Sequence, residues 1–435
     1  MHLVLRTSSV AADMREMKIS GVDWCHTIPD NWSIIPSKYL FRDSNVRRLD
    51  GDIQLTASQK YGIISQVDYM EREQAAIVLA NKGLESWKHV EPLDFIISLR
   101  SFQGGLEMSE AKGCITWHYV VLKAAQKIHH SYYKWLFKST QYITALQRTC
   151  NFIRDGQDLR YSNFAKVPLP YPPVEEQKTI ADFLDTKCAE IDALMEDIRA
   201  EISTLAEYKK SVITEAVTKG LNPDVGMKES GVAWVGKCPE HWKTEKFKYH
   251  FKRRTVKNPG EAQVLSLYRE YGVIPKDSRD DNHNVTSEDT SKYLFVRKGD
   301  FVINKMKAWQ GSVAVSEYEG IVSPAYYVYE FIGSTLHRKY THYFMRNKSF
   351  AAEFRRLSGG IREGQWDLAA ASLENSFICI PPLSEQQVIA DYLDTICYEV
   401  AATIAEKQKQ ISTLEEYKKS LIYEYVTGKK EVPTL

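Results

Sequence analysis

Two long segments of the chain carry apolar residues at the spacing of an extended helix. In residues 175–219 steps of four and three residues alternate along much of the stripe, which is the heptad spacing of a coiled coil. We predict that this helix begins after Pro172 and Pro173 and ends at Gly220, a length of roughly 65 Å. Its stripe comprises Ile180, Leu184, Cys188, Ile191, Met195, Ile198, Ile202, Leu205, Val212 and Ala216.

The same pattern returns near the C-terminus. The string "PPVEEQKTIADFLDT" (172–186) becomes "PPLSEQQVIADYLDT" (381–395), and a second helix follows, with Lys407 where the first stripe has Ile198. Packing of each helix on its own globular domain is one interpretation, but helices of this length without internal breakers are typical of coiled coils. We therefore predict a coiled-coil core that contains Leu184, Ile191, Met195, Ile202, Leu205, Leu393, Val400, Ile404, Ile411 and Leu414.

The repeat extends beyond the helices, because "MKISGVDW" (17–24) returns as "MKESGVAW" (227–234). Two like units joined head to tail close most simply about a pseudo-twofold axis, which makes the helices antiparallel and lets the start of the chain complete its end. The predicted parts are an N-terminal extension (1–16), a globular domain (17–170), a helical spacer (171–226), a second globular domain (227–380) and a second helical spacer (381–435).

Short β-branched and aromatic runs mark the two globular domains. Runs such as "FIISL", "FVIN", "YYVYEF" and "SFICI", separated by turn residues, are typical of strands. Two helices are expected among them, at 131–147 and 337–356. The predicted fold class is α+β, with two mixed, mostly β domains joined by a long antiparallel two-helix coiled coil in a pseudo-twofold internal repeat.

Composition narrows the class of protein. The chain has 435 residues, 43% of them hydrophobic, and a net charge of +1, so any basic surface must be local. Its 7 cysteines form no CxxC pair, which favours a reducing cytoplasm over a disulfide framework. The sequence contains no signal-peptide pattern and no apolar run long enough to span a membrane.

Motifs for catalysis are not found. "GVAWVGKC" (231–238) fits part of a phosphate-binding loop, but Cys238 stands where Ser or Thr would hold magnesium. The sequence lacks G-x-S-x-G, H-E-x-x-H and G-x-G-x-x-G, and its 11 histidines show no metal-ligand spacing. We therefore predict no catalytic residues and no metal site in this chain.

Basic, aromatic and amide side chains gather in a few segments instead. The main ones are "KFKYHFKRRTVK" (246–257), "INKMKAWQGS" (303–312) and "LSGGIREGQW" (357–366), with partial counterparts of the last two in the first half. Lys and Arg suit phosphates, whereas Arg and Gln can pair with guanine and adenine edges. A solvated surface, a glycine-stabilised turn or a structural salt bridge would account for the same residues. The candidate DNA-binding residues are Lys60, Arg100, Gln103, Arg154, Gln157, Lys252, Arg253, Arg254, Arg269, Lys305, Lys307, Trp309, Gln310, Arg362 and Gln365.

Over nearly its full length the chain resembles the DNA sequence-specificity subunit of type I restriction-modification enzymes. The resemblance is carried by residues 169–192 and 202–242 and by their C-terminal echoes, above all by the doubled P-P-x-x-E-Q-x-x-I-A-x-x-L-D string. It implies two target recognition domains, each reading one half of a bipartite, asymmetric double-stranded DNA sequence. The helices would act as a ruler between the half-sites.

The resemblance also implies the partners. Two modification subunits would bind the helices and methylate adenine with S-adenosylmethionine, and restriction subunits driven by ATP, with Mg expected there too, would complete a cytoplasmic complex. This chain would hold no cofactor and perform no chemistry, which agrees with the lack of an N-P-P-F or N-P-P-Y string. The alternatives are a stand-alone DNA methyltransferase or nuclease, and a coiled-coil adaptor without a DNA role.

Overall fold

The chain folds as two compact units. The computed structural model describes residues 15–58, 60–74, 82–98, 101–150, 159–269, 271–279, 286, 289–360 and 366–433, apart from the side chains of Phe102 and Gln103. Unit 1 comprises Met1–Ile198 with Lys409–Leu435, and unit 2 comprises Arg199–Gln408. Each unit therefore combines a globular region with parts of both long helices, and the boundaries drawn at residues 171, 227 and 381 stay a sequence-based prediction.

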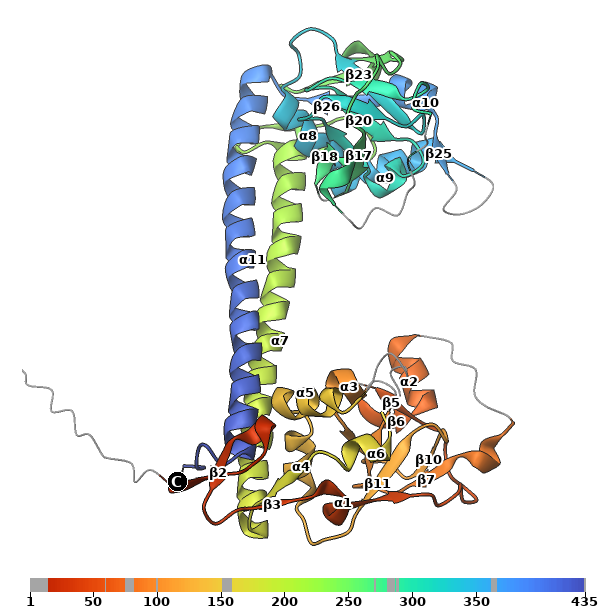
Figure 1. Ribbon diagram of the computed structural model, residues 1–435. Helices are drawn as coiled ribbons and strands as arrows, with labels where there is room; N and C mark the ends of the chain where they lie inside the picture. The colour runs from red at the N-terminus through yellow and green to blue at the C-terminus, as the bar shows by residue number, and fades with distance from the viewer. Residues whose placement is uncertain are drawn as a thin grey trace, which may run out of the picture. The chain divides into compact units, whose positions relative to one another are not determined.

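The two long helices form where the apolar stripes predict them. Helix α7 spans Val174–Lys219 and α11 spans Leu383–Val426. In unit 1, Leu184 of α7 shares a buried cluster with Leu421 of α11, and in unit 2, Val217 shares one with Leu393. The beginning of each helix thus meets the end of the other, so the helices are antiparallel within both units, as predicted (Figure 1).

Burial varies along the stripe. Leu184, Ile191, Met195, Leu393 and Val400 are buried. The remaining residues of the predicted coiled-coil core, Ile202, Leu205, Ile404, Ile411 and Leu414, are partly exposed. Most of the buried members belong to the clusters that the globular regions form near the helix ends, whereas Val400 is buried outside these clusters.

Unit 1 is built on a four-stranded antiparallel sheet in the order β4-β11-β8-β9, with smaller sheets β1-β2, β3-β12, β5-β6 and β7-β10 around it. Its strands are β1 (Met17–Ile19), β2 (Thr27–Pro29), β3 (Ser33–Ile35), β4 (Phe41–Ser44), β5 (Leu55–Ser58), β6 (Gly62–Ser65), β7 (Lys88–Val90), β8 (Phe95–Ile97), β9 (Glu107–Met108), β10 (Gly113–Ile115), β11 (Val120–Ala124) and β12 (Leu169–Tyr171).

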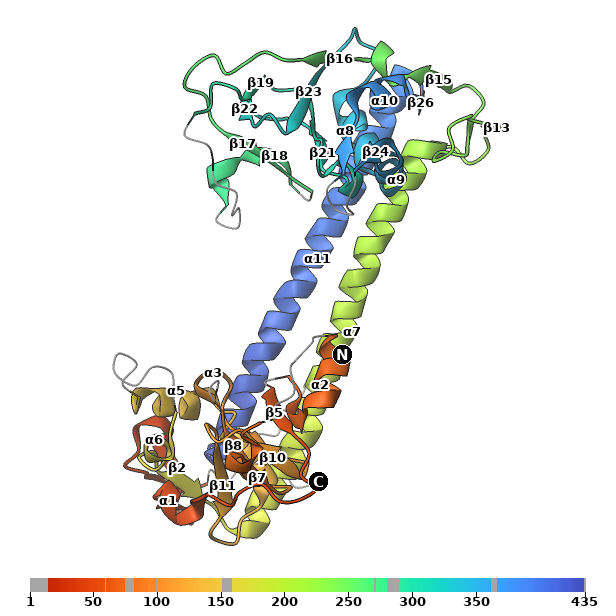
Figure 2. The same ribbon diagram turned by 90° about the vertical axis from the view of Figure 1, so that its right-hand side faces the viewer.

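Unit 2 repeats this architecture. Its central sheet has the matching order β16-β23-β20-β21, and the four smaller sheets recur as β13-β14, β15-β26, β17-β18 and β19-β22 (Figure 2). Its strands are β13 (Met227–Glu229), β14 (Lys237–Pro239), β15 (Lys243–Lys246), β16 (Phe251–Arg254), β17 (Leu265–Tyr268), β18 (Gly272–Pro275), β19 (Leu294–Val296), β20 (Phe301–Asn304), β21 (Val313–Val315), β22 (Gly320–Val322), β23 (Tyr326–Phe331), β24 (Ser358–Gly359), β25 (Asp367–Leu368) and β26 (Phe377–Ile380).

Short helices complete both units, and two sequence predictions need correction here. The helix expected at 131–147 is two helices, α4 and α5, and that at 337–356 is α8 followed by α9. The second break has a local cause, because the Asn347 side chain accepts the Phe350 N–H at 3.0 Å and so caps a new helix. The short helices are α1 (Ser37–Leu40), α2 (Gln66–Glu73), α3 (Ser101–Gly104), α4 (His130–Leu136), α5 (Thr140–Arg148), α6 (Tyr161–Phe164), α8 (Arg338–Arg346), α9 (Lys348–Leu357) and α10 (Ala370–Asn375).

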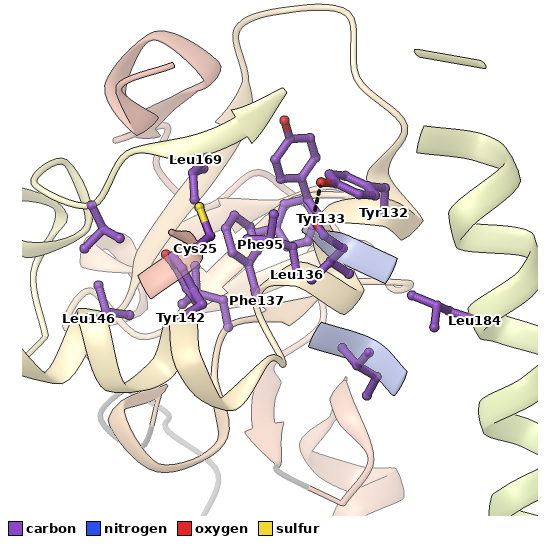
Figure 3. Packing of buried hydrophobic residues seen from close by; sticks show 14 of the residues in the cluster. Cys25, Phe95, Tyr132, Tyr133, Leu136, Phe137, Tyr142, Leu146, Leu169 and Leu184 are labelled. Atoms are coloured by element: carbon purple, nitrogen blue, oxygen red, sulfur yellow. Dashed lines mark hydrogen bonds between the residues drawn. The ribbon is translucent and has the colours of Figure 1, made fainter. Parts of the chain in front are cut away.

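An aromatic core fills the space between sheet and helices in unit 1. Phe95, Tyr133 and Phe137 are fully buried and pack with neighbouring rings, as Figure 3 shows. The Tyr132 hydroxyl donates to the Val426 carbonyl at 2.7 Å, near the end of α11. Burying such rings is strongly stabilising, and the hydroxyl keeps its hydrogen bond within the core.

The repeated string at the start of each long helix makes the same buried contacts in both units. The Gln177 amide accepts the His129 backbone N–H at 2.8 Å and donates to the Pro172 carbonyl at 2.8 Å. Gln386 makes the matching bonds in unit 2, where it accepts the His337 N–H at 2.7 Å. Both amides are fully buried, so they tie each globular region to its helix.

The glutamate of the string receives an indole in each unit. Trp32 Nε1 donates to Glu176 at 2.9 Å, and Trp242 Nε1 donates to Glu385 at 3.1 Å. The tryptophans come from "IPDNW" and "CPEHW", so the two most distinctive parts of the repeat are in direct contact. These acids are acceptors inside the fold.

The start and the end of the chain meet inside unit 1. The Tyr423 hydroxyl of α11 donates to the Trp24 carbonyl at 3.2 Å, and Arg15 lies 2.5 Å from Glu176. The start of the chain therefore packs on its last helix, as the repeat predicted. Arg15, within the predicted N-terminal extension, pairs with Glu176 of α7 and also lies 3.6 Å from Glu431, which follows α11.

Candidate nucleic-acid interface

The sequence-predicted DNA-binding residues divide into those that the structure describes and those that it does not. Arg100, Arg154, Gln157, Arg362 and Gln365 lie outside the described residues, as does the side chain of Gln103. In unit 1 this leaves Lys60, and in unit 2 it leaves eight residues on β16, on the β17–β18 hairpin and after β20. The description of a candidate interface therefore rests on unit 2.

Lys60 is exposed and already has an acidic partner. Its ammonium lies 3.0 Å from Glu73 and over the Tyr61 ring at 4.8 Å. Hydrogen bonds to Tyr61 and Glu73 raise its pKa to about 12. The lysine stays charged, but the neighbouring carboxylate reduces the positive field that a phosphate would meet.

Strand β16 presents three consecutive basic residues with different surroundings. Lys252 is exposed and lies 3.7 Å from Glu330. Arg253 is exposed, lies 3.6 Å from Glu374 and is placed over the Tyr327 ring at 5.8 Å. Arg254 is buried, pairs with Asp300 and donates to the Phe295 carbonyl at 3.2 Å.

The guanidinium of Arg254 is thus used inside the domain. A buried ion pair of this kind is broken only at a high cost in stability. Burial raises the pKa of the partner Asp300, although Arg254 acts to lower it. We therefore leave Arg254 out of the interface and keep Lys252 and Arg253.

A pocket of about 410 Å³ lies beside the predicted "INKMKAWQGS" segment. Its lining brings together Lys276 at the end of the β17–β18 hairpin, Asn304 at the end of β20, and Lys307, Trp309 and Gln310 in the following turn. None of the described residues that line this pocket is acidic. The turn ends at Gly311, whose φ of 80° suits glycine.

A second pocket, of about 320 Å³, adjoins the first through Tyr326, which lines both. It is lined by Arg253, Arg254 and Lys257, and it too has no acid among its described lining residues. We call the combined surface of Arg253, Lys257, Lys276 and Lys307 the basic groove. Such a groove, with tyrosine and tryptophan rings in its walls, suits a polyanion with aromatic bases.

The other candidate residues of unit 2 lie close to the groove or on the hairpin. Lys305 is half-buried, 3.8 Å from Asp367, and its ammonium lies over Tyr327 at 6.0 Å. Trp309 meets Trp366 edge to face at 5.4 Å. Arg269 is exposed at the turn of the β17–β18 hairpin.

Sequence reasoning did not name four residues of this site, of which Lys257 ends the basic segment 246–257. Lys276 and Asn304 line the pocket, and Trp366 packs on its wall. The signal for Trp366 was present, since it directly follows the "IREGQ" string that we singled out. Lys276 had no such signal, because only the hairpin fold brings it opposite Lys307.

Over the described ranges, no group of three His, Cys, Asp or Glu side chains is placed to hold a metal ion. Within the same ranges, no helix has the length and apolarity needed to cross a membrane.

Comparison with known families defines the class of protein. A family model described as the type I restriction modification DNA specificity domain matches residues 45–204 and 247–413, once in each half of the repeat. The two matches cover most of the chain. The chain therefore belongs to the family of type I restriction-modification DNA specificity proteins.

Individual relatives agree with this family. The chain is 26% identical over 299 residues to the type I restriction enzyme MjaVIII specificity subunit of Methanocaldococcus jannaschii, covering 62% of this chain and 64% of that protein. It is 25% identical over 271 residues to the putative MjaX specificity subunit of the same organism, covering 61% and 60%. The chain thus matches less than two thirds of the length of these curated relatives.

A solved structure shares the fold. A chain from a study of complex assembly and conformational transition of the type I R-M system superposes with a TM-score of 0.58 at 15% identity, over 93% of this chain and 99% of that one. At this identity the likeness concerns the fold alone. It agrees with the two α+β units and long helices described above.

Proposed function

We propose that this chain is the sequence-specific DNA-binding subunit of a type I restriction-modification complex. The observation that carries the proposal is the duplication: one sheet order occurs twice, and each copy coincides with a match to the DNA specificity domain. A protein with two copies of a recognition domain of differing surface suits a target with two different halves.

The basic groove of unit 2 supports DNA as the ligand. Lys276 and Lys307 flank the pocket and suit phosphates, and Gln310 lies in the same lining with an amide that suits an adenine edge. We propose that unit 2 reads one half-site through this groove and that unit 1 reads the other. The predicted contacts of Arg100, Arg154, Gln157, Arg362 and Gln365 remain part of this proposal.

The long helices provide the remaining roles. We propose that α7 and α11 set the spacing between the half-sites and bind two modification subunits that methylate adenine. S-adenosylmethionine, ATP and magnesium then belong to the modification and restriction subunits, and this chain acts without catalysis in the cytoplasm. The family match and the likeness to a type I R-M chain support this assignment.

Methylation-aware sequencing of the host genome tests the central claim. With the gene intact we expect methylated adenines in one bipartite, asymmetric word, and we expect that methylation to disappear when the gene is deleted. Replacing residues 227–380 by the corresponding region of another specificity protein should change one half of the word only. A contiguous methylated word, or a word that survives deletion, would contradict the proposal.

A second experiment separates this function from that of a stand-alone methyltransferase. The purified chain is incubated with DNA and labelled S-adenosylmethionine, first alone and then with the modification subunit. We expect methyl transfer only in the second reaction. Transfer by the chain alone would favour the enzyme alternative.

A further inference from the structure

The two units differ at one position of the helix pair where the repeat would place the same residue. In unit 1, Tyr425 of α11 is buried and its ring packs on Phe183 of α7, with 4.5 Å between centroids. The equivalent positions in unit 2 are Ala216 and Tyr392. Unit 2 therefore keeps one aromatic ring of the pair and lacks the other.

A groove lies beside this position, although the Ala216 side chain itself is buried. A cavity of about 610 Å³ is lined by Ala216 and Tyr392, together with Tyr208 and Val212 of α7 and with Leu221 and Met227 of the following segment. We call these six residues the docking groove. Four of them are exposed, with Tyr208 at 51%, Tyr392 at 39% and Leu221 and Met227 at 38% each.

Exposure of this kind is unusual for large apolar side chains that lie together. Single exposed apolar residues need no explanation, but a contiguous apolar group around a hollow marks an interaction site. All six residues belong to unit 2, so the groove does not depend on the placement of unit 1.

The unit 1 counterpart indicates what fits the groove. There the space opposite the first ring is filled by a tyrosine side chain that a helix presents. On the groove side of α7, Tyr208, Val212 and Ala216 follow steps of four residues, the spacing that places side chains on one face of a helix where a second helix can pack. An amphipathic helix with an aromatic side chain at its centre therefore matches both the hollow and the stripe.

We propose that the docking groove of unit 2 receives an aromatic side chain from an amphipathic helix of the modification subunit. This inference rests on the proposed function, because that function supplies the partner. It adds that the two binding positions of the helix pair are unequal. Unit 2 receives an aromatic side chain from its partner, whereas in unit 1 the corresponding aromatic side chain is Tyr425 of this chain. The two modification subunits then bind with different affinities.

Filling the groove from within tests the inference. The substitution Ala216→Tyr restores the unit 1 arrangement and should exclude the incoming ring. The full-length chain is mixed with purified modification subunit, and the complexes are measured by light scattering and by titration calorimetry. We expect the wild-type chain to bind two subunits, and A216Y to bind one normally and the other at least about tenfold more weakly.

Two further variants make the result decisive. Ala371→Tyr adds the same ring at an exposed position of the short helix α10 in the same unit and should bind like the wild type. Tyr208→Lys, at an exposed position of the groove, replaces A216Y if circular dichroism shows that A216Y does not fold. Two subunits bound to A216Y with wild-type affinities would overturn the docking groove alone, whereas a wild-type chain that binds no modification subunit would overturn its occupant and the proposed function together.

Discussion

The two units agree where the globular region meets the helices and differ on the surfaces offered to ligands. Gln177 and Gln386 make the same buried bonds, and the Trp–Glu pairs recur at nearly equal distances. By contrast, the basic groove is only partly repeated in unit 1: in "FRDSNVRR" (41–48), which corresponds to "FKRRTVKN" (251–258), Arg47 matches Lys257 but Asp43 stands where unit 2 has Arg253. A duplicated protein can thus vary its recognition surface while the junction that holds that surface stays fixed.

Each unit contains an equivalent buried aspartate, and the two units pair it with different basic residues. Asp94 in unit 1 is paired with Lys123 of β11 at 2.8 Å, whereas Asp300 in unit 2 is paired with Arg254 of β16. Each acid follows the same turn before the central sheet, and each needs a cation because a buried charge must be paired. The cation comes from a different strand, so basic residues in one unit do not predict those in the other.

The junction gives the largest expected effect. The Gln386 side chain makes three hydrogen bonds, accepting from His337 N–H and donating to the Pro381 and Thr335 carbonyls at 2.9 Å each. Gln386→Ala leaves these buried groups unpaired, and we expect it to lower the free energy of unfolding of unit 2 by about 3 kcal/mol. Differential scanning calorimetry of the full chain measures the change.

The comparison between units sharpens this prediction. Gln177 makes two of the three bonds, so Gln177→Ala should destabilise unit 1, and by less. The neighbouring Gln387, which is exposed and bonds only Asp391, serves as the control, and Gln387→Ala should change the stability by less than about 0.5 kcal/mol. Equal effects of Q386A and Q387A would show that the junction does not hold the unit.

Acidification should destabilise the two units to different extents. Burial and the nearby Arg346 lower the pKa of His342 to about 4, and burial lowers the pKa of His250, both in unit 2. In unit 1, burial lowers the pKa of His130. Burial also acts to lower that of His89, but hydrogen bonds to neighbouring acids outweigh it and raise the pKa.

The sign follows from proton uptake on unfolding. As the pH falls, a histidine whose pKa is lowered by folding is protonated in the unfolded state at a higher pH than in the folded state. Its contribution to the free energy of unfolding is therefore complete above about pH 6.5 and is lost as the pH falls toward 4. For His342 this amounts to about 2 kcal/mol between pH 8 and pH 5. In unit 1 the two histidines oppose each other, so unit 2 should lose more stability.

Hydrogen exchange at pH 8 and pH 5, corrected for intrinsic rates, measures this difference peptide by peptide. Protection in unit 2 should fall more than in unit 1, and His342→Phe should reduce that fall. Equal loss in both units would show that the histidines do not set the acid response.

Much of the fold was predictable from the sequence, for identifiable reasons. The long helices follow from a stripe that continues for many turns, and the repeat itself predicts their antiparallel pairing. The break at Asn347 was not predictable with equal ease, because the apolar spacing of α8 continues into α9 and only the capping side chain interrupts it. At this position the hydrogen bond of the Asn347 side chain ends one helix and begins the next, although the apolar spacing would allow a single helix.

The candidate site was predictable only in part. The segment around Trp309 was found because basic, aromatic and amide residues adjoin in the sequence, whereas Lys276 reaches the same pocket through the β17–β18 hairpin. Arg254 shows a different difficulty, since a run of basic residues does not tell which of them a strand turns inward. Burial is a property of the tertiary fold, and it separates Arg254 from Arg253.

The basic groove gives the next prediction. If the Gln310 amide pairs with a base, Gln310→Ala should reduce discrimination at one position of one half-site by about 1–2 kcal/mol and leave the other half-site unchanged. Lys307→Ala should instead weaken binding to all sequences and lower the salt dependence by about one phosphate contact. Fluorescence anisotropy with the methylated word and its single-base variants measures both.

An exposed glutamine away from the groove provides the control. Gln408→Ala, on α11, should leave affinity and discrimination unchanged. If Q310A affects both half-sites alike, the pocket binds backbone and does not read a base. If K307A changes discrimination more than affinity, the roles of the two side chains are exchanged.

The smallest effect concerns a charged residue within the helical stripes. Lys407 of α11 pairs with Glu201 of α7, whereas the equivalent position in the first helix is the buried Ile198. The glutamate is 57% exposed, so the pair contributes little stability and its loss leaves no buried charge. Lys407→Ile buries more apolar surface, and we expect it to raise the stability of unit 2 by about 0.5 kcal/mol, measured by calorimetry.

Glu201→Gln separates the charge from the shape. It removes the ion pair without adding apolar surface, and it should change stability by less than K407I does. If K407I lowers the melting temperature while E201Q leaves it unchanged, the lysine stem and not its charge fits the seam. If both lower it, the pair contributes to the register of the two helices, because an ion pair across the seam favours one alignment where isoleucine would accept several.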